Sequence, residues 1–104
     1  MGSYRGRLDI IADILHVVSQ NAKKTKIMYQ ANLSYKVLTK YLTEVNEASL
    51  INFEDEKQCY MLTAKGREFL EAYKEYSKDN RHIEKQLNDI HNRKKFLEEL
   101  CSSK

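Results

Sequence analysis

The stretch TKIMYQANLSYKVLTKYL, residues 25–42, decides the fold of this chain of 104 residues. It holds two helix-forming segments on either side of a short break at residues 31–34. It carries lysines and hydroxyl groups but no carboxylate. Two helices that meet at a turn are either an ordinary piece of hydrophobic core or the reading element of a DNA-binding domain. The rest of the chain has to distinguish these alternatives.

Each of the two helices has a candidate capping residue. Thr25 is the expected N-cap of a helix over about 25–31, with Ile27 and Met28 as its buried anchors and Tyr29 in core or turn packing. Ser34 is the expected N-cap of a helix over about 35–48. In that second helix an inward stripe is formed by Leu38, Leu42 and Val45, widened by Tyr41. The opposite face presents Tyr35, Lys36, Thr39, Lys40 and Thr43.

The flanking segments predict a helix before this stretch and a hairpin after it. The first helix, over about 5–20, has apolar positions at helical spacing: Leu8, Ile11, Leu15 and Val18. After the stretch, Ile51 and Phe53 alternate with polar residues, as in a half-buried strand, and residues 55–57 form a polar turn. The return strand covers residues 59–62, with its inward side chains at Tyr60 and Leu62.

The last predicted helix runs from about 64 to 101, on the order of 55 Å. Thr63 is its expected N-cap, and Gly66 allows close packing against the hairpin. Beyond the domain, apolar positions recur in alternating steps of three and four, which is typical of a coiled coil. The a and d positions of this seam are Tyr73, Tyr76, Asn80, Ile83, Leu87, Ile90, Lys94, Leu97 and Cys101.

The seam predicts a partner for the last helix. A single amphipathic helix folded back on its own domain is the alternative, but little of the chain is left to cover it. Full burial of a large apolar side chain contributes roughly 1.5–3 kcal/mol, so a second copy of the same helix is the simplest cover. We therefore expect a homodimer. The seam residues alone leave the direction of the two strands open.

Basic charge is concentrated in one segment. Between Asp13 and Glu44 there is no acidic residue, and the lysines in that interval give a local charge of +5 on a chain of net charge +3. They are Lys23, Lys24, Lys26, Lys36 and Lys40. Clustered basic charge indicates a polyanionic partner, with a solvated basic face as the alternative.

Helix, helix, turn, helix, two-stranded hairpin, helix is the element order of a winged helix-turn-helix domain. In such domains the helix after the turn enters the major groove, and the hairpin, here residues 51–62, is called the wing. We expect a mainly α fold with a small β-hairpin, a DNA-binding domain over 4–66 and a dimerisation helix over 67–102. The recognition helix is the one over about 35–48, and Lys23, Lys24 and Lys26 are expected to meet the DNA backbone.

The segments KIMYQANLSY and YMLTAKG, with the long terminal helix, carry a family resemblance. The chain resembles the small archaeal winged-helix DNA-binding proteins of the ten-kilodalton chromatin-protein type over about residues 7–100. The resemblance implies double-stranded DNA binding and a dimer through an antiparallel coiled coil. It implies wing contacts at Lys57 and Gln58 and recognition positions at Ser34, Tyr35, Lys36, Thr39 and Lys40. The acidic wing residues Glu54, Asp55 and Glu56 depart from what phosphate contact requires.

Other function classes find little support in the sequence. The three histidines and two cysteines do not form a metal-ligand pattern, and no glycine-rich phosphate loop or nucleophile constellation is present. We expect no enzyme activity, no cofactor, no metal and no membrane partner, and a cytoplasmic, nucleoid-associated location. Two alternatives to an architectural DNA-binding protein stay open: a site-specific transcriptional regulator on the same fold, and a winged-helix adaptor that binds proteins and not DNA.

Overall fold

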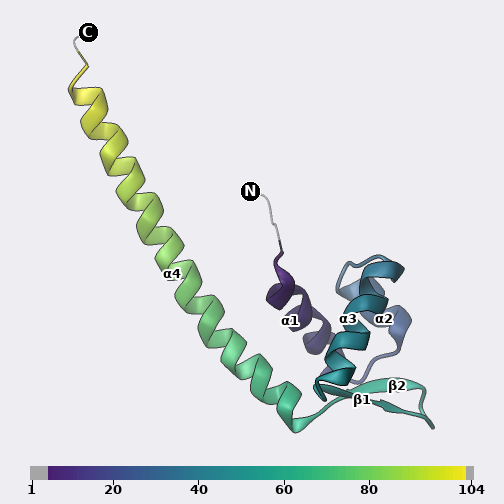
Figure 1. Cartoon of the computed structure of the whole chain (residues 1–104). Coiled ribbons are helices and arrows are strands. Elements are labelled where there is room, and N and C mark those ends of the chain that lie inside the picture. Colours follow the sequence, from purple (N-terminus) through teal and green to yellow (C-terminus); the bar gives the residue numbers. More distant parts are fainter. Residues whose placement is uncertain (1–4, 103–104) are drawn as a thin grey trace. The chain divides into compact units, whose positions relative to one another are not determined.

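The computed structural model describes residues 5–102 and contains four helices and one hairpin within that range. In chain order the elements are α1 (Arg7–Val18), α2 (Lys24–Gln30), α3 (Tyr35–Glu47), β1 (Ile51–Glu54), β2 (Cys59–Leu62) and α4 (Ala64–Leu100) (Figure 1). The predicted order of elements and the mainly helical class are confirmed. The predicted start of the domain at residue 4 lies outside the described residues.

The chain divides into two compact units, the first ending at Tyr73 and the second beginning at Lys74. The first unit contains α1, α2, α3, the hairpin and the first turns of α4. In Figure 1 the three short helices lie together, and the hairpin extends from one end of them. The second unit is the remainder of α4, and its described residues are almost all exposed.

The core of the first unit lies where the three short helices meet. Its fully buried side chains come from α1, α2, α3 and β1, and the largest are Ile14, Leu15, Val18, Ile27, Leu38, Val45 and Ile51. The inward stripe of α3 is confirmed. The inward position predicted for Leu8 is wrong: its side chain is 41% exposed, because Ile11 and Ile14 face the core and Leu8 stands at the open end of α1.

Two helices end in the same hydrogen-bonded motif. At the end of α2, Leu33 N donates to Met28 O at 3.0 Å and Asn32 N donates to Tyr29 O at 3.2 Å. Asn32 has φ 55°, the left-handed conformation that this ending requires and that asparagine tolerates. The end of α3 repeats the motif with Ser49 at φ 64°. These endings satisfy carbonyls that a helix otherwise leaves unpaired.

The hairpin is tied to the chain segment that precedes α2. Ala22 and Tyr60 form an isolated bridge, with N···O distances of 3.2 and 2.8 Å. Lys23 continues the extended backbone and is the N-cap of α2, without a side-chain capping bond. The predicted N-cap at Thr25 is therefore wrong, because the bridge ends at Ala22 and the helix begins before Thr25 is reached.

The hairpin pairs Phe53 with Tyr60 and Ile51 with Leu62. Ile51 is buried, and Tyr60 and Leu62 are partly buried against the core, as predicted. Phe53 is 43% exposed, which contradicts its predicted inward position. It lies one step closer to the tip of the wing, where its ring meets the edge of Tyr60 at 5.0 Å between centroids.

The start of α4 is fastened to the end of α3. Thr63 Oγ1 accepts a hydrogen bond from Gly66 N at 3.0 Å, which confirms the predicted cap, and donates one to Ser49 O at 2.7 Å. A Cβ atom at Gly66 would stand 2.3 Å from Leu50 O and 2.7 Å from Leu62 Cδ1. The predicted close packing at Gly66 is confirmed. Among the described helices, none is long and apolar enough to cross a membrane.

Candidate nucleic-acid interface

The exposed face of α3 is set by its N-terminal cap and its buried stripe. Ser34 Oγ accepts a hydrogen bond from Val37 N at 3.2 Å, so the helix begins where the sequence predicted. With Leu38 and Leu42 buried, the opposite face is turned to solvent. It presents Tyr35, Lys36, Thr39, Lys40 and Thr43, all exposed and none acidic.

The start of α2 lies beside the start of α3. The Nζ atom of Lys24 stands over the ring of Tyr35, 4.1 Å from the centroid. A cation over an aromatic face is attracted by the ring quadrupole, and at an exposed site this contributes about 0.5–1 kcal/mol. Lys24 therefore adds its charge to the exposed face of α3. We use the name α3 face for Lys24 together with the five exposed residues of α3 given above.

The two threonines of the α3 face use their hydroxyl hydrogens within the helix. Thr39 Oγ1 donates to Tyr35 O at 2.8 Å, and Thr43 Oγ1 donates to Thr39 O at 3.0 Å. Their oxygen lone pairs still point outward as acceptors, but a groove-bound ligand gains no donor from them without breaking these bonds. The free donors of this face are the lysine ammonium groups and the Tyr35 hydroxyl.

The turn between α2 and α3 is held by an arginine that precedes α1 and that sequence reasoning did not assign to this role. Arg5 Nη1 donates to Ala31 O at 2.7 Å, Nη2 donates to Asn32 O at 2.9 Å, and Nη1 pairs with Asp13 Oδ2 at 2.9 Å. A planar guanidinium reaches two neighbouring carbonyls at once, which a lysine ammonium cannot do in the same geometry. No local sequence signal predicts it, because the partners lie 26 and 27 residues away.

A hollow of about 290 Å³ separates the α3 face from the wing. It is lined by Lys24, Thr39 and Thr43 on the helical side and by Phe53 and Tyr60 on the hairpin side, with Glu47 also present. The predicted wing contacts lie elsewhere. Gln58, at φ 52°, donates its side-chain amide to Asp55 O at 2.6 Å and so stabilises the turn of the wing.

The remaining predicted basic residues gather around a second hollow, of about 600 Å³, on the α2 side of the wing. Its lining includes Lys23, Lys26 and Lys57, together with Tyr29. Tyr29 is 75% exposed, so its predicted place in core or turn packing is wrong. The sequence contained a signal for the exposure of Tyr29. Lys26 and Tyr29 are three residues apart and share one face of the helix, while Ile27 lies on the buried face.

In the first unit, the pKa of the Asp9 carboxyl group is shifted from its usual value. The hydroxyl of Tyr73 donates to the Asp9 carboxylate, and this bond, with a second from Gly6 N at 2.9 Å, lowers the pKa of Asp9 below its usual 3.8. Tyr73 was predicted as a seam residue, and here it is partly buried against α1. Within residues 5–102, no group of three or more histidine, cysteine or acidic side chains is placed to hold a metal ion.

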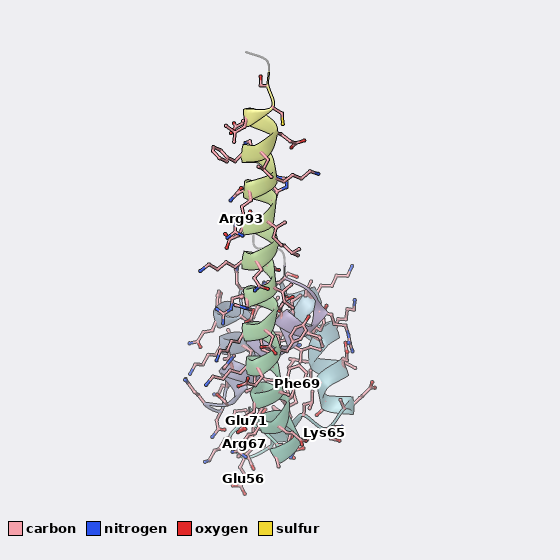
Figure 2. The ribbon with its side chains drawn as sticks, turned by 90° about the vertical axis from the view of Figure 1, so that its left-hand side faces the viewer. Glu56, Lys65, Arg67, Phe69, Glu71 and Arg93 are labelled. Carbon is pink, nitrogen blue, oxygen red and sulfur yellow. The ribbon has the colours of Figure 1, made fainter. Side chains whose placement is uncertain are left out.

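The apolar side chains of the second unit are exposed. Ile83, Leu87, Ile90 and Leu97 are between 54% and 62% exposed, and Cys101 is exposed as well. Phe96 and Leu100 are 59% and 66% exposed and widen this surface near its end, which the three-and-four spacing did not identify. The side chains of this unit, Arg93 among them, stand out around the helix in Figure 2. Asn80 is in contact with Glu84, at 3.4 Å from Nδ2 to Oε1.

Comparison with known proteins gives matches of three kinds. A family model described as winged helix-turn-helix matches residues 4–81. The crystal structure of Sso10a-2, a DNA-binding protein from Sulfolobus solfataricus, matches with a TM-score of 0.78 at 24% identity, covering 85% of this chain and 95% of that one. An uncharacterized protein of Methanocaldococcus jannaschii is 39% identical over 72 residues, or 68% of this chain. The chain spans about a third (33%) of the length of that relative. These matches confirm the fold and the archaeal resemblance drawn from the sequence.

Proposed function

Since the chain belongs to the winged helix-turn-helix family, we propose that it binds double-stranded DNA through the α3 face. The observation that carries this proposal is the composition of that face. Nine consecutive residues, 35–43, include two exposed lysines and no carboxylate, and Lys24 stands beside them. In this family of folds the helix after the turn is the element that enters the major groove.

Each part of the α3 face has a task on duplex DNA. Lys36 and Lys40 neutralise phosphates, and Lys24 adds a third charge at the edge of the face. The N-terminal amides of α3, a helix of 13 residues capped by Ser34, favour a phosphate on the helix axis.

The same face supports binding that tolerates different sequences. Bidentate recognition of guanine is made by arginine or lysine, and that of adenine by asparagine or glutamine. No arginine, asparagine or glutamine occurs over residues 35–43, and the hydroxyl hydrogens of Thr39 and Thr43 are used inside the helix. Lysines that act as point charges hold the backbone more than they read bases. We therefore propose an architectural, nucleoid-associated role in preference to a site-specific regulator.

We propose further that two copies associate through the second unit. Exposed Ile83, Leu87, Ile90 and Leu97 form an apolar stripe on one helix, interrupted by Lys94, and a second copy supplies a matching one. An antiparallel pair centred between Leu87 and Ile90 places every a position opposite a d position. The result is a homodimer with a DNA-binding head on each chain.

Gel-shift titrations across a salt series test DNA binding. We expect the logarithm of affinity to fall with the logarithm of salt, with a slope of about −0.9 for each phosphate neutralised. Affinity that does not change with salt, or that survives Lys36→Ala combined with Lys40→Ala, contradicts the proposal. A selected site preferred over random duplex by about 10³ or more would assign the regulator role. Absence of duplex binding even at low salt would favour the protein adaptor, for which the acidic wing tip is the supporting feature.

A further inference from the structure

The hollow on the α2 side of the wing, which we call the α2–wing hollow, lies on a different face from the α3 face. Tyr60 lines the first hollow and Cys59 lines the second. Successive residues of a strand point to opposite faces of the sheet, so the two hollows open on opposite sides of the hairpin. Their lining residues do not overlap. A duplex held by the α3 face therefore leaves the α2–wing hollow open to another ligand.

Three lysines surround the α2–wing hollow, and no carboxylate lines it. Lys23 is the N-cap of α2, Lys26 lies in the first turn of that helix, and Lys57 comes from the turn of the wing. The bridge between Ala22 and Tyr60 holds these two segments together. The acidic residues that precede Lys57 are not part of the lining, and Glu54 Oε1 accepts a hydrogen bond from Glu56 N at 3.1 Å. The charge of the hollow favours an anion.

The floor of the hollow is mostly apolar, and this decides which kind of anion fits. Tyr29 is 75% exposed and lines the hollow together with Lys26. A phosphate backbone alone gains nothing from an exposed aromatic ring or an apolar floor. A nucleobase does, because every base has a π-face that stacks on an aromatic side chain. In intact duplex DNA these base faces are covered by their neighbours.

We propose that the α2–wing hollow binds an unpaired nucleotide of a single-stranded nucleic acid. The base stacks on Tyr29, and Lys23, Lys26 and Lys57 hold the flanking phosphates. Stacking platforms combined with a basic groove are the general means of binding single strands without sequence preference. This site goes beyond the duplex binding proposed above, and either proposal can fail while the other holds.

Fluorescence anisotropy of the full chain tests the site with three labelled probes of equal length: an oligothymidylate, an abasic single strand and a duplex. For the wild type we expect the oligothymidylate to bind about tenfold more tightly than the abasic strand, since only it offers bases. Tyr29→Ala should remove that advantage and leave duplex affinity within about twofold. Tyr29→Phe, which keeps the ring, should bind the oligothymidylate as the wild type does.

The matched control is Lys36→Ala with Lys40→Ala, which should weaken duplex binding and leave the oligothymidylate unaffected. Equal affinity of wild type for the oligothymidylate and the abasic strand would overturn the proposal, because the hollow would then respond to phosphate charge alone. Equal losses on duplex and single strand in Tyr29→Ala would also overturn it, by placing Tyr29 in the duplex interface. A competition experiment gives a third such outcome. If polyglutamate, which has charge but no bases, displaced the labelled oligothymidylate as effectively as unlabelled oligothymidylate does, the proposal would be overturned.

Discussion

The hydroxyl of Tyr73, on α4, donates a hydrogen bond to the carboxylate of Asp9, in the first turn of α1, across 64 residues of sequence. The bond joins the first and last helices of the first unit. It also stabilises the charged form of Asp9, with help from Gly6 N, and so lowers the pKa of that carboxyl.

Replacing Tyr73 by Phe should make stability less dependent on pH in the acid range. A carboxyl whose pKa is lowered in the folded state stabilises the fold above its usual pKa of 3.8, and loses this contribution as the pH falls through the folded value. Tyr73→Phe should cost about 0.5–1 kcal/mol at neutral pH, a low value because the bond is only part-buried. Urea unfolding should show the difference shrinking towards about pH 2.5. Tyr29→Phe, at an exposed ring, is the control, and a difference that persists in acid would refute the assignment.

Gly66→Ala should destabilise the first unit in spite of the higher helix propensity of alanine. The added Cβ would meet a backbone oxygen, Leu50 O, which cannot move without displacing β1. We expect a net loss of about 1–3 kcal/mol in the free energy of unfolding, measured by denaturant titration. Arg67→Ala, in the same turn of α4 and exposed, should change stability by less than about 0.5 kcal/mol. A stabilised Gly66→Ala variant would mean that the close approach is relieved by a small shift.

Arg5→Lys should loosen the turn between α2 and α3 while keeping the charge. The lysine cannot donate to Ala31 O and Asn32 O together, so a loss of about 1–2 kcal/mol in unfolding free energy is expected. Hydrogen exchange at the amides of the turn should accelerate. The comparison is Arg7→Lys, whose ion pair with Glu44 involves a side chain that is 63% exposed and should contribute little. Unchanged exchange at the turn in Arg5→Lys would show that the clamp is dispensable.

The salt dependence of duplex binding should identify which lysines meet phosphate. Each of Lys36→Ala and Lys40→Ala should reduce the steepness of the slope by about 0.9 if the side chain neutralises one phosphate. Lys85→Ala, at an exposed position of the second unit away from the seam, should leave the slope unchanged. Equal reductions at Lys85 and Lys36 would indicate that total charge, and not the α3 face, determines binding.

Cysteine cross-linking should report the direction of the proposed coiled coil. Cys59 is buried and Cys101 is exposed, so mild oxidation of the wild type reports on Cys101. In the antiparallel pair Cys101 lies opposite Tyr76 and far from its own copy, and we expect no covalent dimer. Tyr76→Cys should then cross-link to Cys101 on non-reducing gels. A disulfide dimer of the wild type would indicate parallel strands, and a mass of one chain in sedimentation would remove the dimer altogether.

The sequence predicted best what short-range chemistry determines. The caps at Ser34 and Thr63 and the buried stripe of α3 follow from residues a few positions apart, and all three were correct. Gly66 was identified for the right reason, because a glycine inside a helix signals close approach. The element order followed from these local signals, since few topologies are compatible with them.

The errors came from contacts between distant residues. Thr25 has the hydroxyl of a good N-cap, but the bridge between Ala22 and Tyr60 determines where α2 begins. Phe53 lies two residues after the buried Ile51, so strand alternation predicts an inward side chain, but Phe53 lies beyond the edge of the core. The clamp made by Arg5 depends on carbonyls whose position no local pattern reveals. The residues of the α3 face could be predicted from the sequence. That the α2–wing hollow lies on the other side of the hairpin could be seen only once the position of the hairpin was known.

The attachment of α4 to α3 has a mechanical consequence. Thr63 and Lys65 hold the carbonyls of Ser49 and Ala48 at the end of α3, at 2.7 and 2.8 Å, and Gly66 packs on the backbone of Leu50. No flexible linker lies between β2 and α4, because Thr63 alone connects them. A tilt of α3 in a groove would therefore be passed to the base of α4 and not absorbed by a loose joint.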